Sequence, residues 1–125
     1  MLSKQAQSLL VNALQQAKLK TSATIHVHFC HRTKKAPVVA ATQFFKHIKL
    51  DKSKNKNTVL IYILEQNRQF VIMGDIAADA LLPKDFWTQC QVLLAGYFKK
   101  DQHSEGLEAV IKKISDALAP YFPAG

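Results

Sequence analysis

Two acidic residues follow a strand-like run and lie one helical turn apart. Asp75 comes directly after Gly74, which ends the apolar run at 70–73, and Asp79 follows four residues later. Positions just after a strand often carry function in α/β folds, and carboxylates are preferred ligands of Ca²⁺ and Mg²⁺. The pair therefore forms a candidate metal site. The structural alternative is that Asp75 caps a short helix and Asp79 is a solvated acid.

A second constellation alternates along a predicted strand. His26, His28 and Cys30 share one strand face, and two imidazoles with a thiolate can bind zinc. A closed zinc site needs four ligands, however, and no second Cys/His pair has ligand spacing. Half-buried strand histidines are the simpler interpretation. Cys30 and Cys90 are too few for a disulfide framework and are interpreted as core thiols.

The chain is basic, with 17 Lys and Arg against nine Asp and Glu and a formal charge of +8. This balance favours an anionic partner such as nucleic acid, a phosphorylated ligand or an acidic membrane face. Lys52, Lys54, Lys56 and Arg68 are the candidate anion-binding residues. Arg68 could equally hold a carboxylate or carbonyl of its turn. No aromatic platform interrupts the lysines, which argues against nucleic acid and favours a solvated loop.

Length and composition predict one domain over residues 1–125. A chain of 125 residues with 48% hydrophobic residues can build one core. No run of about 18 uncharged apolar residues occurs, so we expect no transmembrane segment. Residues 1–20 lack the features of a secretory signal, which predicts a cytoplasmic location.

Hydrophobic spacing predicts an alternation of helices and strands. Ser3 is the expected cap of the first helix, and Ser104 that of the last. The predicted elements are a helix at 3–19, strands at 25–30, 59–64 and 70–74, helices at 37–49 and 86–98, a short helical or irregular crossing at 76–82, and a last helix ending near 118.

The arrangement of these elements follows from the strand at 59–64. Its unbroken apolar run indicates that helices cover both of its faces. The short polar turn at 66–68 predicts an antiparallel hairpin, whereas the link through 37–49 is long enough for a parallel crossover. The predicted fold class is α/β: a three-layer α/β/α sandwich around a small mixed sheet, with a parallel crossover and a β-hairpin.

These elements, in this order, resemble the short, free-standing members of the TPM domain family over residues 22–122. The most specific part is Asn57 followed by the strand at 59–63, where the family typically has Asn-Gly before an apolar strand. Residues 72–75 match a family strand that ends in Gly-Asp. Further matching positions are Arg68, Pro83, Phe86, Trp87, Phe98, the residues at 105–107, Phe122 and Pro123.

At three positions this chain departs from the pattern of the family's metal-dependent phosphatases. Lys56 stands where those members have an acidic residue, Thr58 replaces the glycine of Asn-Gly, and Thr24 replaces another acid. The resemblance thus implies a TPM-like domain with a depleted acidic site. It would act as a non-catalytic binding or scaffolding module for an anionic or membrane-protein partner, with no cofactor required.

Two other functions stay open. One is a Ca²⁺- or Mg²⁺-dependent phosphatase that uses Asp75 and Asp79, so whether the chain is an enzyme is undecided. The other is non-specific binding of nucleic acid, which would lose affinity on replacement of Lys52, Lys54 and Lys56. In every case Asn57 and Gly74 are expected to be structural: Asn57 fixes the strand entry through side-chain bonds to the backbone. The sequence gives no oligomeric state.

Overall fold

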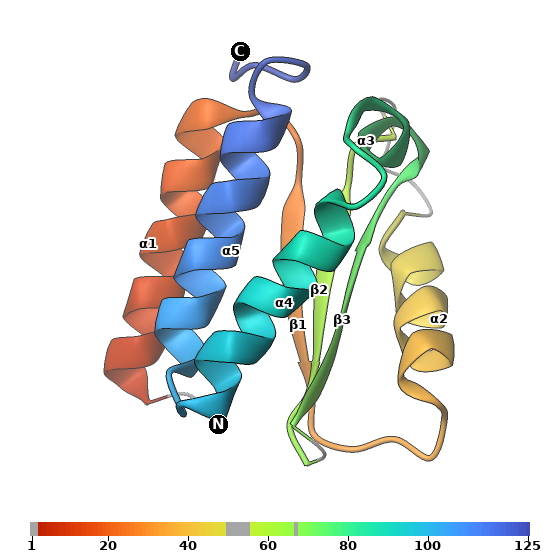
Figure 1. The fold of residues 1–125 in the computed structure, drawn as a ribbon, viewed down its shortest axis with the longest axis vertical. Coiled ribbons are helices and arrows are strands. Elements are labelled where there is room, and N and C mark those ends of the chain that lie inside the picture. The colour runs from red at the N-terminus through yellow and green to blue at the C-terminus, as the bar shows by residue number, and fades with distance from the viewer. Residues whose placement is uncertain (1–2, 50–55, 67) are drawn as a thin grey trace.

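The computed structural model describes residues 3–49, 56–66 and 68–125 (Figure 1). The predicted order of helices and strands is confirmed. The elements are α1 (Lys4–Lys20), β1 (Ile25–Cys30), α2 (Pro37–Lys49), β2 (Val59–Leu64), β3 (Gln69–Gly74), α3 (Ile76–Leu81), α4 (Phe86–Lys99) and α5 (His103–Leu118). Along the described residues, none of these helices combines the length and apolar character needed to cross a bilayer.

The three described strands form one mixed sheet in the order β1-β2-β3. β1 pairs with β2 in parallel, with Ile25 opposite Val59. β2 pairs with β3 in antiparallel fashion, with Val59 opposite Gly74 and Leu64 opposite Gln69. The predicted crossover and hairpin are therefore both confirmed, and β2 is the central strand.

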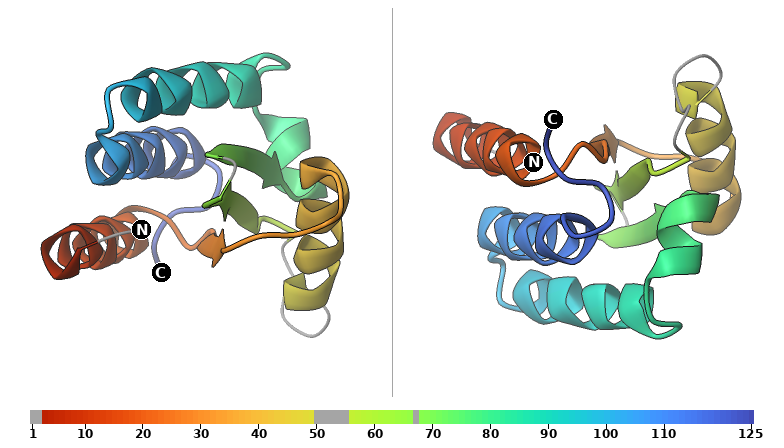
Figure 2. Two further views of the ribbon diagram at one scale, coloured as in Figure 1. Left: turned by 90° about the horizontal axis from the view of Figure 1, so that it is seen from below. Right: turned by 90° about the horizontal axis from the view of Figure 1, so that it is seen from above.

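Helices cover both faces of this sheet, which confirms the three layers. Figure 2 shows α1, α4 and α5 side by side on one face and α2 on the other, with the short α3 beside α2 at one end of the sheet. Since side chains alternate along a strand, β2 supplies both cores. Val59, Ile61 and Ile63 enter the cluster under the three helices, whereas Leu60, Tyr62 and Leu64 enter the cluster under α2.

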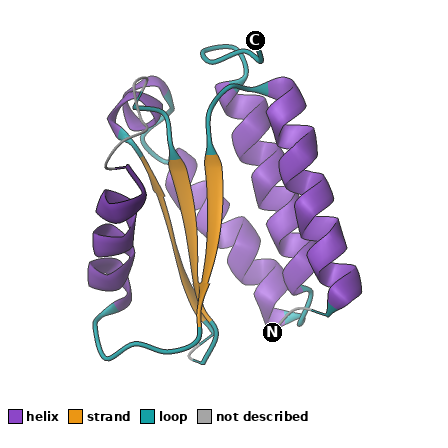
Figure 3. Ribbon diagram, turned by 180° about the vertical axis from the view of Figure 1, so that it is seen from behind, coloured by secondary structure: helices purple, strands orange, loops and turns teal. Residues whose placement is uncertain are grey.

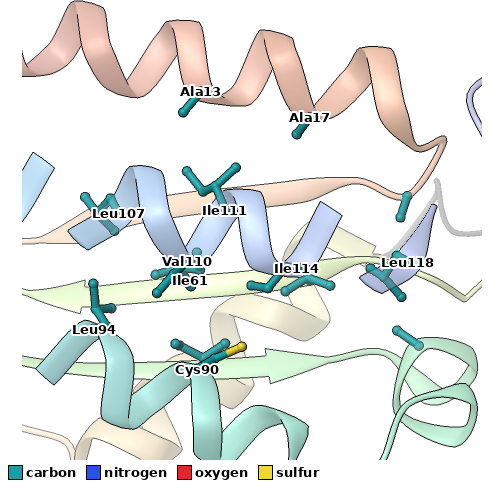
Figure 4. Close-up of a cluster of buried hydrophobic side chains, with 14 of the residues drawn as sticks. Ala13, Ala17, Ile61, Cys90, Leu94, Leu107, Val110, Ile111, Ile114 and Leu118 are labelled. Carbon is teal, nitrogen blue, oxygen red and sulfur yellow. The ribbon is translucent and has the colours of Figure 1, made fainter. Parts of the chain in front are cut away.

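The core under the three helices is closely packed. In Figure 4, Ile61 of β2 lies among Val110 and Ile114 of α5, with Leu94 and Cys90 of α4 beside them. On its other side α5 meets the small residues Ala13 and Ala17 of α1 (Figure 4). Small side chains let two helices approach closely, so α1 reaches the sheet mainly through α5.

The helix ends show one correct and one wrong prediction. The Ser3 hydroxyl accepts a hydrogen bond from the Ala6 amide at 3.1 Å, as expected of a cap. Ser104, in contrast, does not cap the last helix: it lies inside α5 and donates to the Glu105 carboxylate. Asp101 has a left-handed backbone with φ of 58°, which reverses the chain early enough for α5 to begin at His103.

The two ends of the sheet carry different connections. Figure 3 shows the loop at 31–36 and the β2–β3 turn at one end, and α3 with the C-terminal segment at the other. The C-terminal segment is tied to the start of β1, because the Ser22 amide donates to the Phe122 carbonyl at 2.9 Å. The sequence-predicted acidic site belongs to the α3 end.

Candidate functional site

The α3 end of the sheet brings together three of the predicted site residues. Because Val59 pairs with Gly74, the segment entering β2 lies beside the segment leaving β3. The Asp75 amide donates to the Thr58 carbonyl at 2.8 Å, and the Ala77 amide donates to the Lys56 carbonyl at 2.9 Å. Lys56, Asn57 and Asp75 are thus held next to one another by backbone bonds.

Asp75 acts as a helix cap. Its side chain is 2% exposed, and its Oδ1 atom accepts a hydrogen bond from the Ile76 amide at 2.8 Å. A carboxylate at this position satisfies amides that the helix itself leaves without partners. The Lys56 carbonyl serves the next amide, that of Ala77. The capping role considered from the sequence is therefore what the structure shows for this carboxylate.

Asp79 is engaged by an aromatic residue of α4. Its Oδ1 atom accepts a hydrogen bond from the indole Nε1 of Trp87 at 3.0 Å. The same indole covers Gly74: a Cβ atom there would lie 2.3 Å from Cζ2 of Trp87. Gly74 is therefore required by close approach of the ring, which supports its structural role. Sequence reasoning missed this contact, since nothing local links Asp79 to a residue eight positions later.

Asn57 is the least satisfied polar residue of this end. Its side chain is 6% exposed, and its Nδ2 atom has no hydrogen-bond partner in the described structure. An amide nitrogen is a donor and repels a cation. Lys56, directly before it, is exposed and has a left-handed backbone with φ of 52°.

These donors do not fit a Ca²⁺ or Mg²⁺ site. Ca²⁺ takes six to eight oxygen ligands, whereas no three His, Cys, Asp or Glu side chains gather into a metal-binding group among residues 3–49, 56–66 and 68–125. Asp75 and Asp79 already accept hydrogen bonds, and Lys56 adds a positive charge. Of the two further acids considered, Asp85 accepts a hydrogen bond from the Gln89 amide, and Asp51 lies outside the described residues.

The histidines of β1 pack beneath α2. The His28 ring stacks on Phe44 with centroids 3.9 Å apart and lies 5.4 Å from Tyr62. The His26 ring is 5.6 Å from Phe44. Burial lowers the pKa of both imidazoles, and the neighbouring His26 charge lowers that of His28 further. Both are neutral packing residues near pH 7, as the simpler interpretation of the sequence held.

The two thiols lie in different cores. Cys30 is half-buried on the α2 side and donates to the Arg32 carbonyl at 3.4 Å. Burial, together with the Cys30 thiol, raises the pKa of the neighbouring Tyr62 hydroxyl to about 12. Cys90 is fully buried under the three helices, and this burial raises its pKa to about 11. The environment of Cys90 does not favour a thiolate nucleophile.

The predicted anion-binding residues do not form one compact site. Arg68 lies in the turn between β2 and β3, at the opposite end of the hairpin from Lys56. Its guanidinium is 75% exposed and 4.0 Å from the Asp101 carboxylate, so the carboxylate it meets belongs to the α4–α5 connection. Lys52 and Lys54 lie outside the described residues.

Along the sequence, the positive charge is instead concentrated in the segment that contains α2. Residues 31–58 contain eight Lys and Arg and one acidic residue, so they carry seven of the eight net charges. The remaining nine basic and eight acidic residues nearly cancel. We define the basic face as Arg32, Lys34, Lys35 and Lys46, the exposed cations before and on α2. The sequence prediction named Lys52, Lys54, Lys56 and Arg68. Counting charge over longer segments would have added the cations of the basic face.

Comparisons with known proteins agree with this architecture. The family profile of the TPM domain matches residues 1–117, so the match includes α1 as well as the region that begins near residue 22. No protein with a curated description matches significantly. Several solved structures are similar, including the following two. The BA42 protein of the psychrophilic bacterium Bizionia argentinensis is 31% identical with a TM-score of 0.91, over 100% of this chain and 86% of that one.

The second structure is the N-terminal domain of a protein from P. gingivalis. It is 15% identical with a TM-score of 0.77, over 97% of this chain and 78% of that one, and it supports the fold alone. The profile match covers almost the entire chain, and the strand pairing is that expected from the sequence resemblance. This chain belongs to the TPM domain family.

Proposed function

We propose that this TPM domain is a non-catalytic binding module that docks on an anionic surface through its basic face. The observation that carries this proposal is the charge distribution: residues 31–58 hold seven of the eight net positive charges. Concentrated charge of one sign attracts an oppositely charged partner and accelerates its association. Charge needed only for solubility has no reason to gather in one segment of the chain.

The described acidic residues form no ion pair with the basic face. Elsewhere in the described structure three Lys and Arg side chains form ion pairs: Lys20 and Lys112 both bond to Asp116, at 2.9 and 3.0 Å, and Arg68 meets Asp101. Within the described part of the chain, no ion pair involves Arg32, Lys34, Lys35 or Lys46. Lys35 bonds instead to the neutral Gln43 amide. Cations of this kind keep their charge available to a partner.

The acidic residues support the non-catalytic part of the proposal. The name of the family profile refers to a phosphatase, and such activity here would have to use Asp75 and Asp79. Asp75 is buried as a helix cap, and Asp79 accepts the Trp87 indole hydrogen bond. Releasing either carboxylate for a metal would break a contact that holds α3 in place.

An NMR titration of the full chain tests both parts. Polyphosphate should shift amide signals of residues 31–48, with affinity that falls as salt rises. The double variant Lys34→Gln/Lys35→Gln should bind it more weakly. Lys99→Gln/Lys100→Gln, which removes the same charge from exposed residues at the end of α4, should bind like the unaltered protein.

Ca²⁺ and Mg²⁺ are titrated separately. They should leave the signals of Asp75 and its neighbours unchanged. A saturable shift there, together with phosphate-ester hydrolysis that Asp75→Asn abolishes in a folded protein, would establish the phosphatase alternative. Polyphosphate shifts spread evenly over the surface would contradict docking through the basic face.

A further inference from the structure

The first turn of α2 exposes two adjacent apolar side chains. Val38 is 61% exposed and Val39 is 47% exposed. They lie on the side of the helix away from the sheet, because the next two residues, Ala40 and Ala41, are buried against it. Lone exposed apolar residues are common on proteins. A pair beside unpaired lysines is a more specific arrangement.

This pair continues into a polar stripe along α2. Residues 38, 39, 42, 43, 46 and 47 recur at helical spacing and face outward, while Phe44, Phe45 and Ile48 pack on the sheet side. The stripe is apolar at the start of the helix and ends with Lys46 and His47. Lys34 and Lys35 precede the valines with only Ala36 and Pro37 between them, so cations lie at both ends of the stripe.

The position of α2 leaves this stripe accessible. Figure 2 shows α2 as the outer layer on its side of the sheet, with no other described helix over it. The loop at 31–36, which carries Arg32, Lys34 and Lys35, leads directly into the valine-bearing turn (Figure 1). The cations and the apolar pair can therefore meet one surface together.

We infer that the anionic surface is a lipid bilayer, on which the basic face binds acidic headgroups while Val38 and Val39 enter the headgroup boundary. This inference rests on the proposed function and specifies its partner. Lysines near acidic lipids are attracted to the surface, and apolar side chains of a peripheral helix gain by leaving water at the interface. Nucleic-acid phosphates would bind the lysines. They provide no apolar environment into which the valines could be buried.

Vesicle sedimentation with the full chain tests the inference. The protein should remain in solution with phosphatidylcholine vesicles and should sediment with vesicles that contain about 30% phosphatidylserine. Binding should weaken as salt rises, because surface charges are screened. Sedimentation with both kinds of vesicle alike would overturn the role of the basic face.

Charge variants locate the contact. Lys34→Gln/Lys35→Gln should lower the affinity for acidic vesicles by about tenfold or more, since each cation near the surface contributes to binding. Lys99→Gln/Lys100→Gln has the same net charge and should bind nearly as well as the unaltered protein. Equal losses in the two variants would show that net charge alone causes binding, and would overturn the inference.

Valine variants test insertion. Val38→Ser/Val39→Ser should weaken binding by about threefold to tenfold, because two small apolar side chains no longer leave water. The matched control is Val92→Ser on α4, where the valine is 68% exposed outside the basic face; this variant should bind normally. If the double serine variant binds like the control, the valines do not enter the bilayer and the inference fails.

The polyphosphate titration separates this inference from the proposed function. Binding of polyphosphate through Lys34 and Lys35 without binding to acidic vesicles would overturn the lipid inference and leave the binding module intact. If the protein binds neither polyphosphate nor acidic vesicles, both the proposed function and the lipid inference are overturned. Duplex DNA bound through the same lysines more tightly than acidic vesicles would replace the lipid by nucleic acid.

Discussion

Strand β2 presents buried apolar side chains to both faces of the sheet, but the two faces are covered by different numbers of helices. On one face, Ile61 and Ile63 lie fully buried under α1, α4 and α5. On the other, Leu60 and Leu64 are equally buried, although a single helix covers them. The inner residues of that helix include the half-buried Phe44, Phe45 and Ile48. A strand that is uniformly apolar therefore says nothing about how thick each covering layer is.

The two layers also differ in how their positive charges are paired. The three-helix layer pairs two of its cations, Lys20 and Lys112, with Asp116. The α2 layer carries the unpaired basic face. Like charges destabilise a compact state through repulsion, so a charged layer requires stability from elsewhere. We interpret the three-helix layer as the source of that stability and the α2 layer as the surface for binding.

The reactivity of the two thiols should show the largest difference between the layers. Cys90, fully buried with a pKa raised to about 11, should react only when the three-helix core opens. A global opening that costs about 5 kcal/mol or more slows reaction at least about a thousandfold. Cys30 is half-buried and should react in the folded state. Alkylation followed by mass spectrometry measures both rates, with both thiols reacting in urea as the control. Equal rates in buffer would contradict a thick, stable layer.

Truncation of one apolar side chain in each layer should lower the unfolding free energy by different amounts. Leu94→Ala in α4 removes a fully buried side chain and should cost about 2–5 kcal/mol of unfolding free energy. Ile48→Ala in α2 removes a half-buried one and should cost about 1 kcal/mol, since less apolar area returns to water. Urea denaturation gives both values. If Ile48→Ala lost more unfolding free energy than Leu94→Ala, the α2 layer and not the three-helix layer would contribute more to stability.

Two glycines on the three-helix side should respond in opposite directions. Gly74→Ala forces a Cβ to within 2.3 Å of the Trp87 ring and should destabilise by about 1–3 kcal/mol through overpacking. It should also change Trp87 fluorescence. Gly96→Ala meets no atom within 4 Å and should stabilise α4 by about 0.5–1 kcal/mol. If Gly74→Ala left the unfolding free energy unchanged, the Trp87 indole could move away from Asp79 at little energetic cost.

The α2 layer should show the smallest effect, a dependence of stability on pH. Burial lowers the pKa of His26 and His28 in the folded state. The unfolded chain therefore binds protons first, and the free energy of unfolding should fall as the pH drops below about 6.5. Urea denaturation at about pH 7.5 and about pH 5.5 measures the difference, in a window where exposed carboxylates stay ionised. His26→Gln/His28→Gln should flatten the dependence, and an unchanged slope would exclude these imidazoles as its cause.

The candidate site could be predicted only in part, and the reason is the range of the contacts. The cap at Asp75 was foreseeable because a cap acts on the next few residues. Its proximity to Lys56 and Asn57 also followed once the hairpin was predicted. The bond from Trp87 to Asp79 was not foreseeable, since it depends on the angle at which α4 crosses β3. The contact of Arg68 with Asp101 was not foreseeable either, since it joins the β2–β3 turn to the α4–α5 connection.

The sequence by itself determined the type and order of the elements, the parallel crossover and the hairpin. It also determined that both faces of the central strand are covered, because side-chain periodicity and turn length are local properties. Only the tertiary structure decided which helices lie on which face. That assignment placed cations from before and within α2 on one exposed layer, and it engaged both predicted acidic ligands in structural hydrogen bonds. These outcomes depend on distances between segments remote in the chain, which no local pattern encodes.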